Sequence, residues 1–255
     1  MKISVCIITL NEEENLRRCL GSCAALADEI VVLDSGSTDG TETVAREFGA
    51  CWAVCEWPGY VQQKNKVIQM ASYDWVLSLD ADEAISPNLL GVLKRLKQEG
   101  APVEVGGYSI PRCVYYEGKW IRHGDWYPDR LVRLFCRERA SFAGGRVHER
   151  LELDGKVRVL EGDIEHYSFS DSADHWARCQ KYARLWAADA CDAGKSVGIL
   201  TPWLHGGFRW LRGYVLRAGF LDGRQGWRIA TLSAREVCLK YRLLRQLNEA
   251  GRVTA

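Results

Sequence analysis

The most informative stretch of the chain reads Trp75-Val76-Leu77-Ser78-Leu79-Asp80-Ala81-Asp82-Glu83. It joins a short apolar run to two aspartates that are separated by one residue. Such a run is typical of a strand buried on both faces of a parallel sheet, and ligands of these sheets bind beyond the carboxyl ends of the strands. Carboxylate oxygens at that position suit Mg²⁺ or Mn²⁺, which predicts a metal that bridges a diphosphate. An Asp-x-Asp pair is also common where a helix begins, so this interpretation depends on the rest of the chain.

Two earlier apolar runs also end in polar residues. Residues 3–8 are followed by Thr9-Leu10-Asn11-Glu12, and residues 30–33 are followed by Asp34-Ser35-Gly36-Ser37-Thr38-Asp39-Gly40. Apolar residues at helical spacing come after each of them. The alternation of strands and helices predicts a parallel α/β sheet, with three polar strand ends along one edge.

Each of these polar residues also has a purely structural interpretation. Asn11 is predicted to cap the first helix, with Glu14 in the capping-box position three residues later. Asp34 is either a turn former or an acceptor of hydrogen bonds from a nucleoside base or ribose. Three polar strand ends in succession favour the binding interpretation.

In the second half of the chain the predicted secondary structure changes twice, first to strands and then to helices. It becomes strand-rich after Gly106, with strands expected near residues 108–110, 131–135 and 147–151. Asp154-Gly155 lies between two further apolar runs and predicts a tight hairpin. After Asp171 the apolar residues recur at helical spacing. A boundary near Ser170 therefore divides residues 1–170 from a helical C-terminal region, residues 171–255.

Three motifs together resemble those of the family 2 glycosyltransferases. They are Ile7-Ile8-Thr9-Leu10-Asn11-Glu12-Glu13, Asp34-Ser35-Gly36-Ser37-Thr38-Asp39-Gly40-Thr41 and Leu79-Asp80-Ala81-Asp82-Glu83. The resemblance implies the GT-A fold over residues 1–170, which is an α/β domain with a Rossmann-like, mostly parallel sheet. It also implies a nucleotide-sugar donor and a Mn²⁺ or Mg²⁺ cofactor.

A narrower resemblance is to the small bacterial lipopolysaccharide-core β-glucosyltransferases. It rests on the metal motif, on Val147-His148-Glu149, and on Gly219-Phe220-Leu221-Asp222-Gly223 with Lys240-Tyr241. It implies transfer of a hexose, with inversion, from a UDP-sugar to a lipopolysaccharide-core acceptor.

The resemblance also implies roles for individual residues. The nucleoside is expected to be held by Thr9, Asn11, Glu12 and Asp34. The nucleotide or its diphosphate is expected near Lys64 and Asn65. The ribose and the metal are expected near Asp80, and the metal is expected to be ligated by Asp82.

Inversion requires a carboxylate that deprotonates the acceptor hydroxyl as it attacks the anomeric carbon. The family places this acid some tens of residues after the metal motif, which makes Glu149 the predicted base. Asp125 and Asp129 are weaker rivals, and without the family context Glu149 would be interpreted as a surface residue on a strand.

Other polar residues have two interpretations each. His166 is either a third metal ligand or a hydrogen-bonded structural histidine, and His148 is expected only to orient Glu149. Arg130 and Arg133 are expected either to meet phosphates or to be solvated strand residues.

The C-terminal fifth of the chain is basic and aromatic. From residue 200 to the end there are ten Lys or Arg and three Asp or Glu, although the whole chain has a net charge of +1. Aromatic residues among arginines suit a helix at the surface of an anionic membrane, or one that packs on the catalytic domain with its arginines solvated. No motif for binding nucleic acid accompanies the charge.

Processive members of the family carry Gln-x-x-Arg-Trp near the end of the catalytic region. Here Arg209-Trp210 is preceded by Gly206 where the glutamine would stand. This departure predicts an enzyme that adds a single sugar. No apolar run reaches the length of a membrane-spanning helix and no signal peptide is recognised, so a cytoplasmic protein is expected, with its ten cysteines as free thiols.

These features favour an inverting, metal-dependent hexosyltransferase that uses UDP-glucose and a lipopolysaccharide core or related surface glycan. Another family 2 enzyme with a rhamnosyl or mannosyl donor is the nearest alternative. A sugar nucleotidyltransferase would need a glycine-rich loop after the first strand, and residues 9–14 contain no glycine. A non-catalytic glycan-binding protein has no need of Asp80, Asp82 and Glu149 together.

Overall fold

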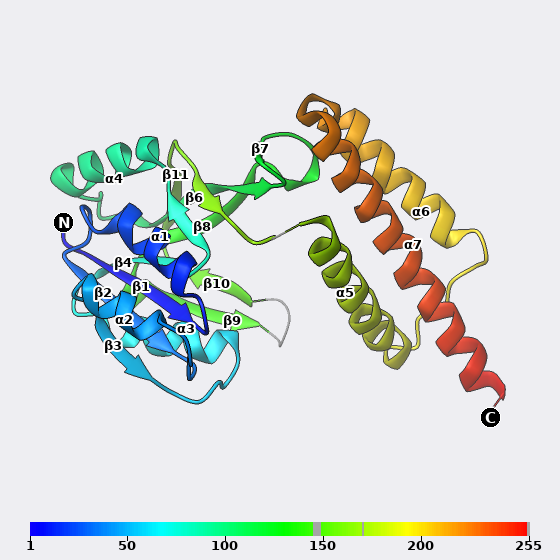
Figure 1. Cartoon of the computed structure of the whole chain (residues 1–255), viewed down its shortest axis with the longest axis horizontal. Helices are drawn as coiled ribbons and strands as arrows, with labels where there is room; N and C mark the ends of the chain where they lie inside the picture. Colours follow the sequence, from blue (N-terminus) through cyan, green and yellow to red (C-terminus); the bar gives the residue numbers. More distant parts are fainter. Residues whose placement is uncertain (145–148, 170, 254–255) are drawn as a thin grey trace. The chain divides into compact units, whose positions relative to one another are not determined.

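The fold is taken from a computed structural model, which describes residues 1–144, 149–169 and 171–253. The chain divides into two compact units (Figure 1). The first contains Met1–Cys113 and Asp129–Tyr167, and the second contains Val114–Pro128 and Ser168–Ala255. The boundary expected near Ser170 therefore misses one feature, because residues 114–128 belong with the C-terminal helices.

The first unit is organised around four parallel strands in the order β3-β2-β1-β4. They are β1 (Ile3–Thr9), β2 (Glu29–Asp34), β3 (Cys51–Val54) and β4 (Trp75–Asp80). Ile3, Val5 and Ile7 enter one apolar cluster, and Cys6 and Ile8 enter another. Both faces of the sheet are thus covered, which explains why its central strands are continuously apolar.

Helices cover both faces of these strands (Figure 1). The cluster on one face includes residues of α1 (Glu13–Cys23), α2 (Thr41–Glu47) and α4 (Pro87–Glu99). The cluster on the other face includes residues of α3 (Tyr60–Gln69). The strands and helices expected over the first 80 residues are confirmed by this arrangement.

The sheet continues beyond β4 with antiparallel strands. β8 (Asp129–Cys136) pairs with β4, and β6 (Val105–Tyr116) pairs with β8. The path then runs through β12 (Ile164–His166) to β5 (Glu83–Ile85). A separate ladder joins β9 (Ala140–Gly144) to β10 (Glu149–Leu153). The strands expected near 108–110 and 131–135 are confirmed. For the strand expected at 147–151, residues 149–151 belong to β10, and residues 147–148 lie outside the described residues.

The hairpin expected at Asp154-Gly155 is wrong. β10 pairs with β9, and the strand after the turn, β11 (Lys156–Val159), pairs in parallel with β6. The turn passes so close to β6 that a Cβ at Gly106 would overlap the Asp154 carbonyl oxygen. This close approach directs the chain from one ladder to the other.

The second unit is mostly helical. It also contains the end of β6, residues 114–116, which pairs with β7 (Lys119–Ile121), and the short turn η1 (Gly124–Trp126). Asp171 caps α5 (Ser172–Asp192) by accepting hydrogen bonds from the amides of Ala173 and Asp174. The remaining elements are α6 (Thr201–Trp210), the π-helical turn η3 (Leu211–Leu216), η4 (Gly219–Asp222) and α7 (Gly223–Val253).

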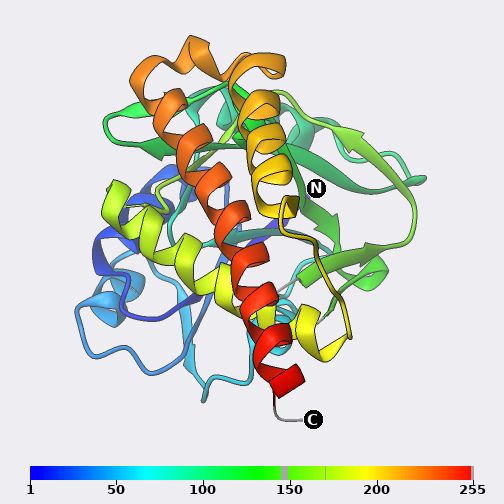
Figure 2. The same ribbon diagram turned by 90° about the vertical axis from the view of Figure 1, so that its right-hand side faces the viewer.

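In this unit α5 and α6 each pack along α7 (Figure 2). The face of α5 that packs inward includes Cys179, Ala183, Ala187 and Ala190, which confirms the helix expected from the apolar spacing. Gly206 of α6 faces α7, where a Cβ would overlap the Cys238 sulfur. A glutamine at position 206 would therefore require Cys238 to move. Within the described part of the chain, no helix has the length and apolarity needed to cross a bilayer.

Candidate active site

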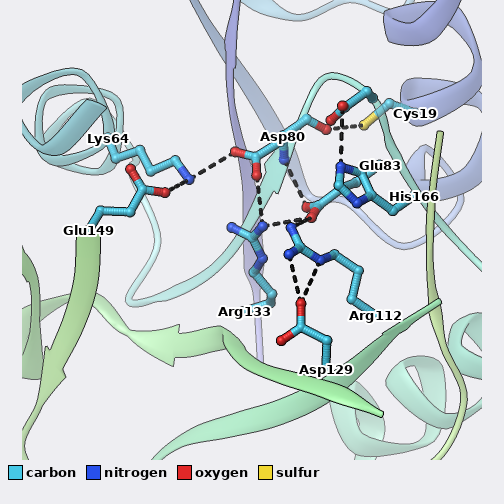
Figure 3. A network of polar contacts seen from close by, with 10 residues as sticks. Cys19, Lys64, Asp80, Glu83, Arg112, Asp129, Arg133, Glu149 and His166 are labelled. Atoms are coloured by element: carbon cyan, nitrogen blue, oxygen red, sulfur yellow. Dashed lines mark hydrogen bonds and ion pairs between the residues drawn. The ribbon is translucent and has the colours of Figure 1, made fainter. Parts of the chain in front are cut away.

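The Asp-x-Asp motif lies where β4 ends and β5 begins (Figure 3). Asp80 is the last residue of β4, and each of its carboxylate oxygens contacts a cation. Oδ1 lies 2.9 Å from Lys64 Nζ, and Oδ2 lies 2.7 Å from an Arg133 nitrogen. The carboxylate of Asp80 is therefore held from two sides, by α3 and by β8.

Arg133 is buried, with 4% of its surface exposed, because β8 runs antiparallel beside β4. Besides Asp80 it binds Glu83 Oε1 at 2.6 Å, and Glu83 also accepts a hydrogen bond from the Asp80 amide at 3.0 Å. A second arginine, Arg112, joins Glu83 to Asp129. A buried arginine is costly unless it is paired, and here two carboxylates provide the pairing.

These pairs fix the charge state of the site. Burial by itself would raise the pKa of Asp80, but the charges of Arg133 and Lys64 outweigh it and hold this pKa well below its usual range. Burial likewise opposes the charge of Arg133, yet Asp80 and Glu83 raise the pKa of Arg133 above its usual range. Asp80 and Arg133 are therefore both charged at neutral pH.

Lys64 connects this cluster to the base predicted from the sequence. Its ammonium group contacts both Asp80 and Glu149 Oε1, and the lysine is only 2% exposed. The other oxygen, Glu149 Oε2, is buried and has no hydrogen-bond partner among the described residues. Glu149 thus has one oxygen that Lys64 holds and one that lacks a partner among the described residues.

Asn65 has a structural role beside Lys64. Its amide nitrogen donates to the Phe142 carbonyl at 2.8 Å, and its oxygen accepts from the Phe142 amide at 2.8 Å. These two bonds hold β9 against α3, and β9 in turn pairs with the strand that begins at Glu149. One N–H and one acceptor site of Asn65 are used in this way, and its contact with the donor stays a prediction.

Asp82 lies beside His166. The Nε2 atom of His166 is 3.3 Å from Asp82 Oδ2, because the antiparallel pairing of β12 with β5 places His166 opposite Glu83. The Nδ1 atom is buried and unpaired within the described part of the chain. No group of three or more His, Cys, Asp or Glu suited to a metal occurs among residues 1–144, 149–169 and 171–253. Asp82 and His166 therefore form a pair of potential ligands that a substrate would have to complete.

The net charge of the cluster is compatible with a divalent cation. Its cations are Lys64, Arg112 and Arg133, and its carboxylates are those of Asp80, Asp82, Glu83, Asp129 and Glu149. The carboxylates exceed the cations by two, which is the charge that Mn²⁺ or Mg²⁺ would neutralise.

Residues at the ends of β1 and β2 form a second part of the candidate site. Thr9 is buried, and its hydroxyl has no hydrogen-bond partner among the described residues. Asp34 is also buried and accepts hydrogen bonds from the amides of Gly36 and Ser37 and from the Ser37 hydroxyl. The turn-forming interpretation of Asp34 is thereby confirmed, whereas its contact with a nucleoside stays a prediction.

The expected cap at Asn11 is wrong. Asn11 has a positive φ of 54°, and α1 begins two residues later with Glu12 in the capping position. The Asn11 oxygen instead accepts from the Thr38 amide at 2.8 Å, and the Glu12 amide donates to the Thr41 hydroxyl at 2.9 Å. Both residues thus tie the end of β1 to the turn that follows β2.

Comparison with known proteins identifies the family. The family model of glycosyl transferase family 2 matches residues 4–160, which is more than half of the chain. The chain belongs to this family. The match confirms the resemblance seen in the three motifs and, with the observed sheet, the α/β GT-A fold class.

Two relatives match along most of their length. An uncharacterized glycosyltransferase of Rickettsia typhi is 28% identical over 98% of this chain and 89% of its own. The lipopolysaccharide core biosynthesis glycosyltransferase LpsC of Rhizobium meliloti is 28% identical over 95% of this chain and 94% of its own. Similarity to LpsC confirms the resemblance to lipopolysaccharide-core glycosyltransferases.

Among solved structures, glucosyl-3-phosphoglycerate synthase of Mycobacterium tuberculosis in complex with Mn²⁺, UDP and phosphoglyceric acid aligns with a TM-score of 0.47. It is 21% identical, over 71% of this chain and 76% of that chain.

The rival bases and the two arginines have other partners. Asp125 belongs to the second unit, where it pairs with Arg209, Arg212 and Arg217. Asp129 is paired with Arg112. Arg130 is exposed, and Arg133, expected to meet phosphate or solvent, is buried with Asp80 and Glu83. His148 lies outside the described residues.

Sequence reasoning missed the buried part of the cluster. Glu83 is part of a motif but has no predicted role, and the two interpretations of Arg133, a phosphate contact or a solvated strand residue, do not include a buried ion pair. The available signal is the setting of Arg133, a single charge inside the apolar strand Leu131-Val132-Arg133-Leu134-Phe135. A lone charge in such a strand indicates a buried ion pair.

Proposed function

We propose that this family 2 glycosyltransferase transfers one hexose, with inversion, from UDP-glucose to a lipopolysaccharide core or related cell-surface glycan. One observation carries the proposal. Lys64 joins Asp80, at the end of a central strand, to Glu149, whose second oxygen is unpaired among the described residues. The similarity to LpsC supports the class of acceptor.

In the proposed reaction the acceptor hydroxyl attacks the anomeric carbon of the hexose on the face opposite the leaving group. The bond from that carbon to the UDP oxygen breaks, and UDP leaves with the bonding electrons. The hydroxyl proton passes to Glu149 Oε2. Lys64 holds Oε1 and so orients the carboxylate toward the acceptor.

The proposed metal ligands are Asp82 and His166. A Mn²⁺ or Mg²⁺ ion held there would neutralise the charge that develops on the diphosphate. The excess of two carboxylates in the cluster supports this assignment. Asp80 is less suited to be a third ligand, because Lys64 and Arg133 already occupy its two oxygens.

The proposed donor-binding residues are those at the ends of β1 and β2. The Thr9 hydroxyl is buried without a hydrogen-bond partner among the described residues, and a donor nucleotide would supply one. Asn11, Glu12 and Asp34 hold the loops at these strand ends, and Asp80 is proposed to lie near the ribose. Asn65 is proposed to act mainly by positioning β9, since its side chain is bonded to Phe142.

A thermal-shift screen tests the proposed donor. A ligand that binds only the folded state raises its stability, by about 2.7 kcal/mol when its concentration is one hundred times Kd. UDP and UDP-glucose are expected to raise the melting temperature in the presence of Mn²⁺ and much less in its absence. A larger shift with a GDP- or dTDP-sugar would contradict the UDP assignment and favour a mannosyl or rhamnosyl donor.

The same screen separates an enzyme from a binding protein. UDP release is expected in every sample in which UDP-glucose produces the shift. Binding with no UDP release, even with an isolated lipopolysaccharide core added, would favour a non-catalytic nucleotide-sugar-binding protein.

A glycolipid acceptor would place the reaction at a membrane surface. We propose that the basic segment after residue 200 brings the enzyme there as a peripheral protein of the cytoplasmic face. Its ten Lys or Arg against three Asp or Glu support attraction to anionic lipid.

A further inference from the structure

The second unit exposes an apolar stripe along α6 and η3. Its members are spaced by three or four residues, so they lie on one side of the helix. They are between 44% and 68% exposed, and they are Leu200, Leu204, Phe208, Leu211 and Val215. Trp203 at the margin is 60% exposed. A contiguous exposed apolar surface of this kind marks an interaction site.

A polar groove of about 400 Å³ lies beside the stripe, between α6 and α7. Phe208 contributes to both, because it is exposed in the stripe and also lines the groove. The charged residues of the groove are Arg209, Arg212, Glu236 and Lys240. The apolar stripe and the charged groove therefore share an edge on the same pair of helices, which lie side by side in Figure 2.

The groove carries more positive charge than its carboxylates neutralise. Arg209, Arg212 and Arg217 share one carboxylate, that of Asp125, at distances of 2.6, 3.0 and 3.2 Å. Of these arginines, Arg209 and Arg212 line the groove, together with Lys240 and one carboxylate, that of Glu236. Among the described lining residues, three cations against one carboxylate leave an excess of two positive charges.

These cations repel one another in a partly buried place. Burial, together with the charges of Arg212 and Arg217, holds the pKa of Arg209 below its usual range despite Asp125. Burial and the charge of Arg209 lower the pKa of Lys240 in the same way, despite Glu236. The Nε–H of Arg212 is buried and lacks an acceptor among the described residues. An anion in the groove would relieve the repulsion and supply that acceptor.

We propose that the groove between α6 and α7 binds the headgroup phosphate of an anionic phospholipid, while the apolar stripe enters the bilayer beside it. A soluble phosphate would use the groove but leave the stripe in water. A phospholipid satisfies both, since its phosphate and its acyl chains meet at the depth of an interfacial helix. The biological role of this lipid binding rests on the proposed glycolipid acceptor. The binding itself does not, because it requires neither donor nor metal.

Vesicle co-sedimentation of the full chain, without nucleotide or metal, tests the proposal. The vesicles contain phosphatidylcholine alone or phosphatidylcholine mixed with phosphatidylglycerol. Binding is expected only to the mixed vesicles and is expected to weaken with salt. The double variant Arg212→Gln/Lys240→Gln should lose about fivefold in partition coefficient per charge removed. Phe208→Ser/Leu211→Ser, which changes exposed residues, should also reduce binding.

The matched control removes one lysine and one arginine from another helix of the same unit. Lys181 and Arg184 are exposed on α5, and Lys181→Gln/Arg184→Gln should bind nearly as well as the unchanged protein. An equal loss of vesicle binding in this control would show general electrostatic attraction and would overturn the assignment of the phosphate to the groove.

A second arm distinguishes the source of the phosphate. Glycerol phosphate at constant ionic strength should compete with vesicles for the unchanged protein but not alter the residual binding of Arg212→Gln/Lys240→Gln. If glycerol phosphate binds in the groove and vesicles do not bind at all, the ligand is a soluble phosphate and the assignment to lipid is wrong. Vesicle binding is measured without UDP-glucose, so its outcome is independent of whether the chain transfers glucose.

Discussion

Lys64 is the residue that unites the candidate active site. It lies on α3, and its ammonium group contacts Asp80 from β4 and Glu149 from β10. A buried amine is tolerated only with such partners, so each carboxylate stabilises the position of the other through it. The sequence predicted Asp80 and Glu149, but it did not predict that one lysine contacts both.

At the residue scale, Asp82→Asn tests the metal site. The change keeps the size of the side chain and removes its charge, so the affinity for Mn²⁺ in the presence of UDP should fall about tenfold or more. Calorimetric titration of Mn²⁺ measures the effect. Asp129→Asn is the matched control, because it removes a carboxylate of the same cluster that pairs with Arg112. Equal loss in both variants would contradict the assignment of the metal to Asp82.

At the scale of elements, close contacts in the second unit depend on glycine. A Cβ at Gly226 would overlap the Gly219 carbonyl oxygen, at the junction of η4 and α7. Gly226→Ala should therefore lower the free energy of unfolding by about 1–3 kcal/mol, as overpacking does. Gly207 on α6 has open space around it, and Gly207→Ala should raise this free energy by up to about 1 kcal/mol. Urea denaturation measures both changes in the free energy of unfolding. If Gly207→Ala were destabilised and Gly226→Ala unaffected, the packing described would be contradicted.

The helix α5 contributes a group that responds to pH. His175 is 4% exposed, and its Nδ1 atom lies 3.1 Å from the Tyr116 hydroxyl within the second unit. Burial lowers the pKa of His175 from 6.5 to about 4. Because the folded state disfavours the protonated ring, the stability from the neutral form is complete above pH 6.5 and is lost as the pH falls toward 4.

The expected loss over this interval is up to about 3 kcal/mol in the free energy of unfolding. Comparing the unchanged protein with His175→Phe by urea denaturation isolates the contribution of His175, since other groups titrate in both. The variant should be less stable at pH 7, where the Tyr116 contact is lost, and should change less between pH 6.5 and 4. Parallel pH profiles would show that His175 is not the responsible group.

Elements with one dominant apolar pattern could be predicted from the sequence, and elements defined by distant contacts could not. β1, β2 and β4 follow from apolar runs that burial on both faces of the sheet imposes, and α5 follows from the helical spacing of its one buried face. The Asp154-Gly155 turn has the local signature of a hairpin, but Gly106 on a strand far away in the sequence determines where it packs. Arg133 likewise lies in a strand whose apolar neighbours indicate burial, but its partners, Asp80 and Glu83, are distant in the sequence and could not be predicted from it.

At the scale of the whole molecule, the proposed chemistry and the proposed lipid site belong to different units. Every residue of the acidic cluster lies in the first unit, and the groove and stripe lie in the second. Arg212→Gln/Lys240→Gln should therefore leave the release of UDP from UDP-glucose in solution unchanged within about twofold, a small effect of the kind typical for surface substitutions. A loss of this activity comparable to that of Glu149→Gln would contradict the separation of the two roles.

Glu149 provides the most direct measurement. Proton NMR can follow the hydrolysis of UDP-glucose, with water as the acceptor, and distinguish the two anomers of the released glucose before they equilibrate. Attack on the face opposite UDP predicts that β-glucose appears first. Glu149→Gln should slow its appearance by about 10²–10⁴-fold, the usual contribution of a positioned general base, with the affinity for UDP nearly unchanged. Release of α-glucose first, or a Glu149→Gln enzyme that retains most of its turnover, would contradict the account.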